Sequence, residues 1–85
     1  MSAPTVELLV RQDCHLCEVA RTALERILPD FKIVATVTDI DQDPELRAEY
    51  GDRVPVTLVN GSEHGYFDVD ESRLRRTLQT LCKRN

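Results

Sequence analysis

The segment that decides the fold is TVELLVRQDCHLCEVARTALERILP, residues 5–29. Residues 5–10 are rich in apolar and β-branched side chains, which is typical of a short strand. Apolar residues then recur at the spacing i, i+3, i+4 and i+7, which predicts a helix with one apolar stripe that ends at Pro29. The stripe consists of Leu16, Val19, Ala20, Ala23, Leu24, Ile27 and Leu28. Cys14 and Cys17 therefore lie at the junction of a strand and a helix.

A second strand and a short helix are expected next. Residues 31–38 alternate between apolar and polar side chains, which predicts a strand. A strand–helix–strand unit of this length implies a right-handed crossover between parallel, adjacent strands. The sequence Asp-Pro-Glu at residues 43–45 is typical of a helix N-terminus. We expect that helix to end at Tyr50, with Gly51 in the left-handed cap position.

The last third of the chain predicts a hairpin and a final helix. Residues 54–59 are a third strand, and Asn60-Gly61 predicts a tight turn into an antiparallel fourth strand over residues 62–67. The final helix is expected to begin near Asp70. Its buried stripe is expected to consist of Leu74, Leu78, Leu81 and Cys82.

The order β-α-β-α-β-β-α predicts an α/β three-layer sandwich with a four-stranded mixed sheet, in one domain over residues 1–85. The net charge of −4 and the absence of Trp weigh against a nucleic-acid partner. Apolar runs reach about three residues, whereas a membrane-spanning helix needs about 20. We expect no signal peptide, and three cysteines do not suggest a secreted disulfide framework. We expect a cytoplasmic monomer with no membrane partner.

The chemistry of the chain is expected at the Cys14-His15-Leu16-Cys17 motif. Two intervening residues on a first helical turn bring the sulfurs close enough to bond or to share a metal. The helix N-terminus favours negative charge, so it should stabilise a Cys14 thiolate and lower its pKa below about 8.5. A protonated His15 would add to this effect. Cys17 should remain a thiol, so the pair suits thiol–disulfide exchange with Cys14 as nucleophile and Cys17 as resolving thiol.

Other interpretations of the pair remain open at this point. One is a structural disulfide, although closing a four-residue loop stabilises a fold by only about 2 kcal/mol. Another is a non-enzymatic zinc or [2Fe–2S] module, in which the cysteines of two chains share the metal, since only scattered His64 and Cys82 could complete a site within one chain. A third is a redox-silent binding domain. We assign no residue as a metal ligand. We expect His64 to be exposed and Tyr50 to be a core residue.

A second motif is Arg-Val-Pro at residues 53–55, just before the third strand. Because proline is excluded from the interior of a central strand, Pro55 should occupy the entrance of that strand. The early CxxC motif, the later Val-Pro and the order of elements resemble a glutaredoxin, a small member of the thioredoxin fold. The resemblance covers roughly residues 5–81 and implies a thioredoxin-like sandwich with thiol–disulfide oxidoreductase activity.

The resemblance also implies the substrate-binding residues. In the family the proline is cis, faces the CxxC motif, and follows a residue whose backbone pairs with a bound peptide or glutathione; that residue is Val54 here. Arg11 occupies the position of the family's basic residue, three before the first cysteine, and Asp68 that of its acidic residue. We therefore assign substrate binding to Arg11, Arg53, Val54, Pro55 and Asp68.

Two departures place the chain nearer to the short bacterial glutaredoxin-like proteins. His15-Leu16 replaces the usual Pro-Tyr between the cysteines, and Gly-Tyr-Phe-Asp at residues 65–68 replaces the usual Gly-Gly and acidic residue. The ring of Tyr66 should crowd glutathione, so we expect weak glutathione binding and no tightly bound cofactor. The expected partners are a disulfide-containing protein substrate and an electron donor, either thioredoxin reductase or glutathione.

Overall fold

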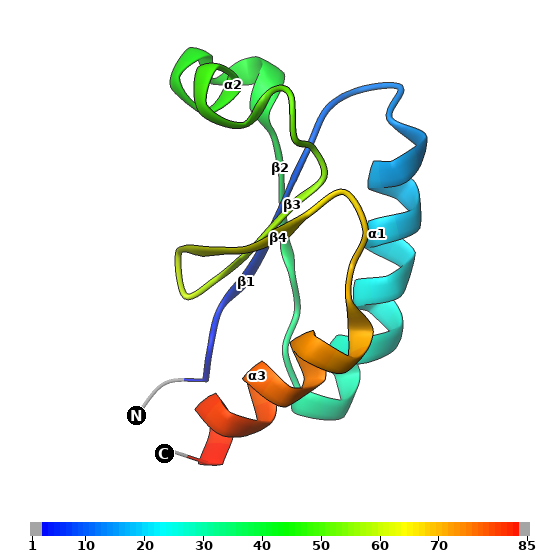
Figure 1. Cartoon of the computed structure of the whole chain (residues 1–85), viewed down its shortest axis with the longest axis vertical. Coiled ribbons are helices and arrows are strands. Elements are labelled where there is room, and N and C mark those ends of the chain that lie inside the picture. The colour runs from blue at the N-terminus through cyan, green and yellow to red at the C-terminus, as the bar shows by residue number, and fades with distance from the viewer. Residues whose placement is uncertain (1–2, 84–85) are drawn as a thin grey trace.

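A computed structural model of the chain describes residues 3–83 and shows a four-stranded sheet flanked by helices (Figure 1). The elements are β1 (Val6–Val10), α1 (His15–Ile27), β2 (Thr36–Asp39), α2 (Pro44–Tyr50), β3 (Val56–Val59), β4 (Ser62–Tyr66) and α3 (Glu71–Lys83). Two 3-10 helices, η1 (Leu28–Phe31) and η2 (Ile40–Gln42), follow α1 and β2. The order β-α-β-α-β-β-α predicted from sequence is confirmed. Within this part of the chain, no helix is both long and apolar enough to cross a membrane.

The sheet is mixed, as predicted, with the strand order β2-β1-β3-β4. β1 runs parallel to β2 and antiparallel to β3, and β3 runs antiparallel to β4. Asn60 and Gly61 connect the last two strands with positive φ angles of 52° and 81°. Two consecutive residues with positive φ form the tight turn that matches the twist of a hairpin. Asn and Gly adopt positive φ more readily than other residues, which explains this pair.

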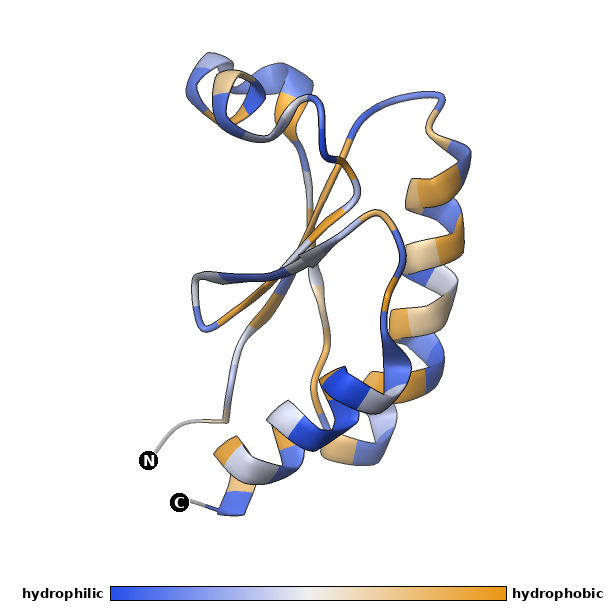
Figure 2. Cartoon of the chain, viewed as in Figure 1, coloured by the Kyte–Doolittle hydropathy of each residue, from blue (hydrophilic) through white to orange (hydrophobic). Residues whose placement is uncertain are grey.

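Two apolar clusters on opposite faces of the sheet make the three layers. Successive residues of a strand point to opposite faces, so Leu8 and Leu9 belong to different clusters. The larger cluster joins β1 and β3 to α1 and α3, and it contains Val6, Leu8, Ala20, Leu24, Ile27, Leu28, Ile33, Val59, Leu74 and Leu78. The smaller cluster, on the face of η2 and α2, contains Leu9, Ile40, Val56 and Leu58. Figure 2 shows the hydrophobic residues of the sheet concentrated in the two central strands.

The predicted starts of two strands and the predicted conformation of Gly51 were wrong. β2 begins at Thr36, because the chain after α1 forms η1 and then turns at Lys32, whose φ is 58°. β3 begins at Val56 rather than at residue 54. Gly51 is right-handed, with φ of −58°, and not in the left-handed cap expected of it. Glycine still suits this position, since a Cβ there would lie 2.5 Å from the carbonyl oxygen of Arg47.

The predicted apolar stripe of α1 was also partly wrong. Leu16 and Val19 are 43% and 49% exposed, whereas Cys17 is only 2% exposed. α3 lies across the C-terminal half of α1 and leaves its first turns uncovered (Figure 1). On α3 itself, Leu74 and Leu78 are buried as predicted, and Leu81 and Cys82 of its last turn are partly buried.

An ionic network fixes the start of α3 to the end of α1. Glu71 accepts from Arg26 at 2.8 Å and from Arg75 at 3.0 Å, and Arg75 also donates to Asp30 at 2.8 Å. The hydrogen bonds from Arg26 and then from Arg75 lower the pKa of the Glu71 carboxyl. A lowered folded-state pKa means that this contribution to stability is present at neutral pH and is lost as pH falls through that value. At neutral pH the network therefore joins the first turn of α3 to the end of α1 and to η1.

We predict that Leu24→Ala lowers the free energy of unfolding by about 2–5 kcal/mol, because it removes a buried side chain from the larger cluster. Urea denaturation followed by circular dichroism measures this change. The matched control is Val34→Ala, since Val34 is 91% exposed and should change stability by less than about 0.5 kcal/mol. Similar effects of the two substitutions would show that the core is not as described.

Candidate active site

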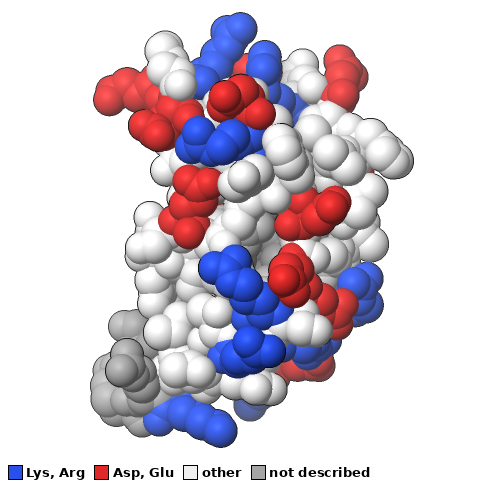
Figure 3. Space-filling model, in the orientation of Figure 1, with Lys and Arg blue, Asp and Glu red and all other residues white. Residues whose placement is uncertain are grey.

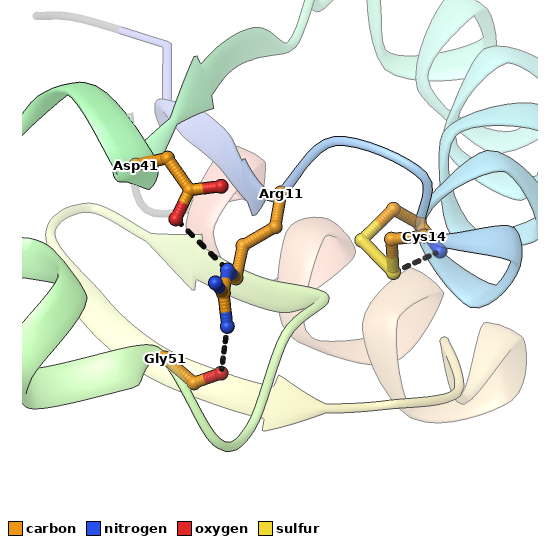
Figure 4. The surroundings of a disulfide bond; sticks show 5 residues. Arg11, Cys14, Asp41 and Gly51 are labelled. Atoms are coloured by element: carbon orange, nitrogen blue, oxygen red, sulfur yellow. Dashed lines mark hydrogen bonds and ion pairs between the residues drawn. A yellow bond between two sulfur atoms is a disulfide. The ribbon is translucent and has the colours of Figure 1, made fainter.

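Three loops meet at one end of the sheet because of the strand register. Leu9 of β1 pairs with Val56 of β3, and Val56 pairs with Tyr66 of β4. The loop that follows β1, the loop that enters β3 and the loop that follows β4 therefore all leave the sheet at the same end. Figures 1 and 4 both show the loop into β3 passing beside the start of α1. The candidate active site lies between these loops.

The cysteine pair forms the start of α1. Cys14 is the N-cap residue, with extended backbone angles, and its Sγ accepts a hydrogen bond of 3.2 Å from the N–H of Cys17. The two cysteines form a disulfide, with their Cα atoms 5.2 Å apart (Figure 4). The sulfur of Cys14 thus occupies the place where a helix has N–H groups without intrahelical partners. The same N–H and the helix dipole would stabilise a thiolate there.

The two sulfurs belong to residues that differ in accessibility. Cys14 is partly exposed, and Cys17 is buried on the side of α1 that faces the sheet. A reagent in solution therefore reaches Cys14 before Cys17. His15, between them, is exposed and contributes no buried contact.

The loop into β3 presents free backbone groups. The Val54–Pro55 bond is cis, which confirms the prediction made from the resemblance. Pro55 is buried, and its carbonyl oxygen accepts a 2.7 Å hydrogen bond from the N–H of Phe67. By contrast, neither the N–H nor the C=O of Val54 is hydrogen-bonded within residues 3–83. These two groups are available to an extended peptide.

Arg11 does not face the cysteines. Its Nε donates to Asp41 at 2.9 Å and its Nη1 donates to the carbonyl oxygen of Gly51 at 3.4 Å. Figure 4 shows the guanidinium pointing away from the disulfide and toward these two acceptors. The Nε of Arg47 lies 3.7 Å from the same Asp41 oxygen. The sequence analysis missed Asp41; the acidic run at residues 39–52 was the one signal that could have indicated a carboxylate partner.

Arg53 is also surrounded by carboxylates. Its guanidinium lies 3.5 Å from Glu63, 3.7 Å from Glu49 and 3.8 Å from Asp52, and it stacks over the ring of Tyr50 at 5.4 Å. These contacts tie α2 to β4. Tyr50 packs against the smaller apolar cluster, as expected of a core residue. Figure 3 shows acidic and basic side chains intermixed over this end of the molecule.

The end of β4 and the loop after it carry the remaining predicted residue, Asp68, and two aromatic residues. Asp68 is exposed and lines a cavity of about 310 Å³ with Thr57, Gly65 and Arg73. Tyr66 and Phe67 precede it, and their rings meet edge to face with centroids 5.0 Å apart. The sequence analysis singled out Tyr66 but not Phe67.

His64 lines the same cavity and is partly buried. The expectation that it is exposed was therefore wrong. Its Nε2 lies 3.1 Å from the hydroxyl oxygen of Thr77. Partial burial, and then the positive charge of Arg73, lower the pKa of His64, while Asp70 raises it. The imidazole therefore favours its neutral form and belongs to the packing between β4 and α3.

Metal-ligating residues do not cluster around the cysteine pair in the part of the chain that the structure describes. Over residues 3–83, no three His, Cys, Asp or Glu side chains lie close enough together to hold a metal ion. Cys82 is the free cysteine of this region and is partly buried on α3.

Comparison with known proteins identifies the family. The sequence model of the Glutaredoxin-like domain (DUF836) matches residues 5–79. The protein Rv0508 of Mycobacterium tuberculosis is 42% identical over 80 residues, which are 88% of this chain and 82% of that protein. The X-ray structure of the protein XcR50 from X. campestris is 33% identical and covers 89% of this chain and 97% of its own, with a TM-score of 0.73.

A more distant neighbour supports the fold alone. The structure of a mutant thioredoxin from Halobacterium salinarum is 19% identical, and the alignment covers 94% of this chain and 75% of that one with a TM-score of 0.65. The chain therefore belongs to the Glutaredoxin-like domain (DUF836) family, and it has a thioredoxin fold whose Cys14–Cys17 pair supports a redox role.

Proposed function

We propose that this domain is a small dithiol thiol–disulfide oxidoreductase. The observation that carries the proposal is the geometry of the cysteine pair. Cys14 Sγ caps α1, accepts the Cys17 N–H at 3.2 Å and is partly exposed, while Cys17 is buried within bonding distance behind it. One sulfur is placed to attack an external disulfide and the other to complete the exchange.

The reaction proceeds in two exchanges. The Cys14 thiolate attacks one sulfur of a substrate disulfide, so a new S–S bond forms, the substrate S–S bond breaks, and the second substrate sulfur leaves as a thiolate that takes a proton from water. Cys17 then loses its proton to water and attacks Cys14 Sγ, which releases the first substrate sulfur as a thiolate that is protonated by water. Two electrons have passed to the substrate, and the domain holds the Cys14–Cys17 disulfide. An external dithiol or thiol, from thioredoxin reductase or glutathione, returns it to the reduced form.

Val54 supplies the platform for the substrate. Its free N–H and C=O can pair with an extended peptide in the manner of an added strand. That pairing would hold the substrate disulfide at the end of the sheet where Cys14 lies. His15 follows Cys14 in the sequence, and a protonated imidazole there would stabilise a Cys14 thiolate further.

We predict that iodoacetamide alkylates Cys14 in the reduced protein about tenfold or more faster than Cys17 or Cys82 near neutral pH. The reason is that Cys14 combines exposure with the N–H groups of the helix start, whereas Cys17 is buried. Mass spectrometry of peptides from a time course measures the three rates. Equal rates would remove the basis for calling Cys14 the nucleophile.

We also predict that Cys14→Ser abolishes disulfide reduction and that Cys17→Ser accumulates a mixed disulfide with the substrate, because the resolving thiol is absent. Non-reducing electrophoresis after incubation with a protein disulfide such as insulin measures the trapped species. Cys82→Ser is the matched control and should keep full activity, since Cys82 lies on α3 outside the site. Full activity of Cys14→Ser would exclude the mechanism. Metal analysis and a visible spectrum of freshly purified protein test the alternative of a zinc or [2Fe–2S] module.

We propose further that glutathione is a poor electron donor and that a protein reductant supplies most of the electrons. The resemblance to glutaredoxins implies that Arg11 would bind a glutathione carboxylate. Here its guanidinium already donates a hydrogen bond to Asp41. The side chain of Tyr66 stands where the family has a glycine that lets glutathione approach the backbone. Both features weaken the binding of a small anionic thiol and leave an extended peptide unaffected.

We predict that Asp41→Asn lowers the KM for glutathione by about threefold to fivefold, because it frees Arg11 from a partly exposed ion pair worth at most about 1 kcal/mol. A steady-state assay with excess small disulfide measures this KM. Glu49→Gln is the matched control: it removes the same charge from the same end of the molecule, but its partner is Arg53. An equal change in both variants would indicate a general effect of charge, and no change in Asp41→Asn would show that the Arg11–Asp41 pair does not limit glutathione.

A further inference from the structure

Phe67 adopts a backbone conformation that bulky residues avoid. Its φ is 61°, in the left-handed region where glycine is the favoured residue and Asn and Asp are tolerated. The other non-glycine residues with positive φ in the described part of the chain are Asp13, Lys32 and Asn60, which are all polar. Strained positions of this kind occur preferentially at functional sites. The chain therefore has an aromatic residue at a position where glycine would adopt the observed backbone conformation at a lower cost in free energy.

The ring of Phe67 does not pack in the hydrophobic core. Phe67 and Tyr66 belong to neither apolar cluster, and they are 44% and 51% exposed. The two rings instead contact each other edge to face, with an interplanar angle of 81°. The N–H of Phe67 is bonded to the carbonyl oxygen of Pro55, so the pair is held beside the loop into β3. Two half-exposed aromatic rings are thus fixed at the surface.

These rings adjoin the groups that would receive a peptide. Val54, with its free N–H and C=O, immediately precedes the proline to which Phe67 is bonded. Leu16, between the two cysteines, exposes a further apolar side chain at the same end of the sheet. A peptide that pairs with Val54 runs next to Phe67, because the N–H of Phe67 is bonded to the residue that follows Val54. A side chain beside its cysteine can therefore reach these rings.

We propose, on the basis of the proposed oxidoreductase function, that Phe67 and Tyr66 form an aromatic docking site for a large apolar side chain next to the reacting cysteine of a protein substrate. Aromatic rings attract aromatic and aliphatic side chains both by burial of apolar surface and by edge-to-face contact. The site selects among protein disulfides by the residue beside the cysteine. The conformational cost at Phe67 is then explained by a gain that arises only when substrate is bound.

The test compares disulfide-linked homodimers of two short peptides that differ only beside the cysteine, one with Phe and one with Ser. We expect the wild-type protein to reduce the Phe peptide with a kcat/KM at least about fivefold higher than the Ser peptide. In Phe67→Gly this ratio should fall below about two. Because glycine suits a φ of 61°, the variant should fold with a Tm within about 5 °C of the wild type. Phe67→Asn, whose side chain also tolerates this conformation, provides a second variant.

Lys32→Gly is the matched control, because Lys32 has a φ of 58° and lies after η1, outside the site. This substitution removes the same unfavourable left-handed conformation of a non-glycine residue. The variant should keep the wild-type ratio of kcat/KM for the Phe and Ser peptides. A wild-type ratio near one, or an unchanged ratio in both Phe67 variants, overturns the docking site. Reduction of hydroxyethyl disulfide by the wild type separates the two proposals. If the protein reduces this small disulfide but the peptide ratio is near one, only the docking site is overturned. If it reduces no disulfide, both proposals are overturned.

Discussion

The antiparallel pairing of β1 with β3 at the centre of the sheet is the constraint on which the site depends. Leu9 is paired with Val56, so the end of β1 and the start of β3 lie side by side. β4 continues the same register through the pairing of Val56 with Tyr66. A shift of one residue in this register would exchange the two faces of the strand and separate the loops. Burial of Leu9 and Val56 against η2 and α2 prevents that shift, since both lie in the smaller apolar cluster.

The polar environment of the Cys14 sulfur is set by the start of α1, where the sulfur accepts a backbone N–H. A disulfide that closes a four-residue loop stabilises a fold by about 2 kcal/mol at most, so the cysteine pair is a weak structural element. The N-cap position of Cys14 has a larger consequence, because its sulfur accepts a backbone N–H that would otherwise have no partner within the helix. The arginines of the predicted site do not add to this field directly, since Arg11 and Arg53 are both paired with carboxylates.

The local patterns in the sequence were sufficient for most of the fold. Alternation, the Asn60-Gly61 turn and the spacing of the α1 residues each depend on neighbours along the chain, and they predicted the order of elements and the mixed sheet correctly. The exposure of Leu16 could not be predicted in this way, because it depends on where α3 crosses α1. The Arg11–Asp41 pair joins residues 30 positions apart, and no local pattern specifies such a contact.

The distribution of charge has a consequence for how this domain distinguishes its partners. The acidic residues that give the chain its net charge of −4 include Asp41 and Glu63, which hold the guanidinium groups of Arg11 and Arg53 near the site. A cation that is already paired with a carboxylate attracts an anionic ligand weakly, because that ligand must displace the existing partner. Among the residues that the structure describes, the groups that remain free at this end of the sheet include the backbone of Val54 and the exposed side chains of Leu16, Tyr66 and Phe67. Recognition by main-chain pairing and apolar contact, as we propose, would favour an extended polypeptide over a small charged thiol, since only the polypeptide can use both.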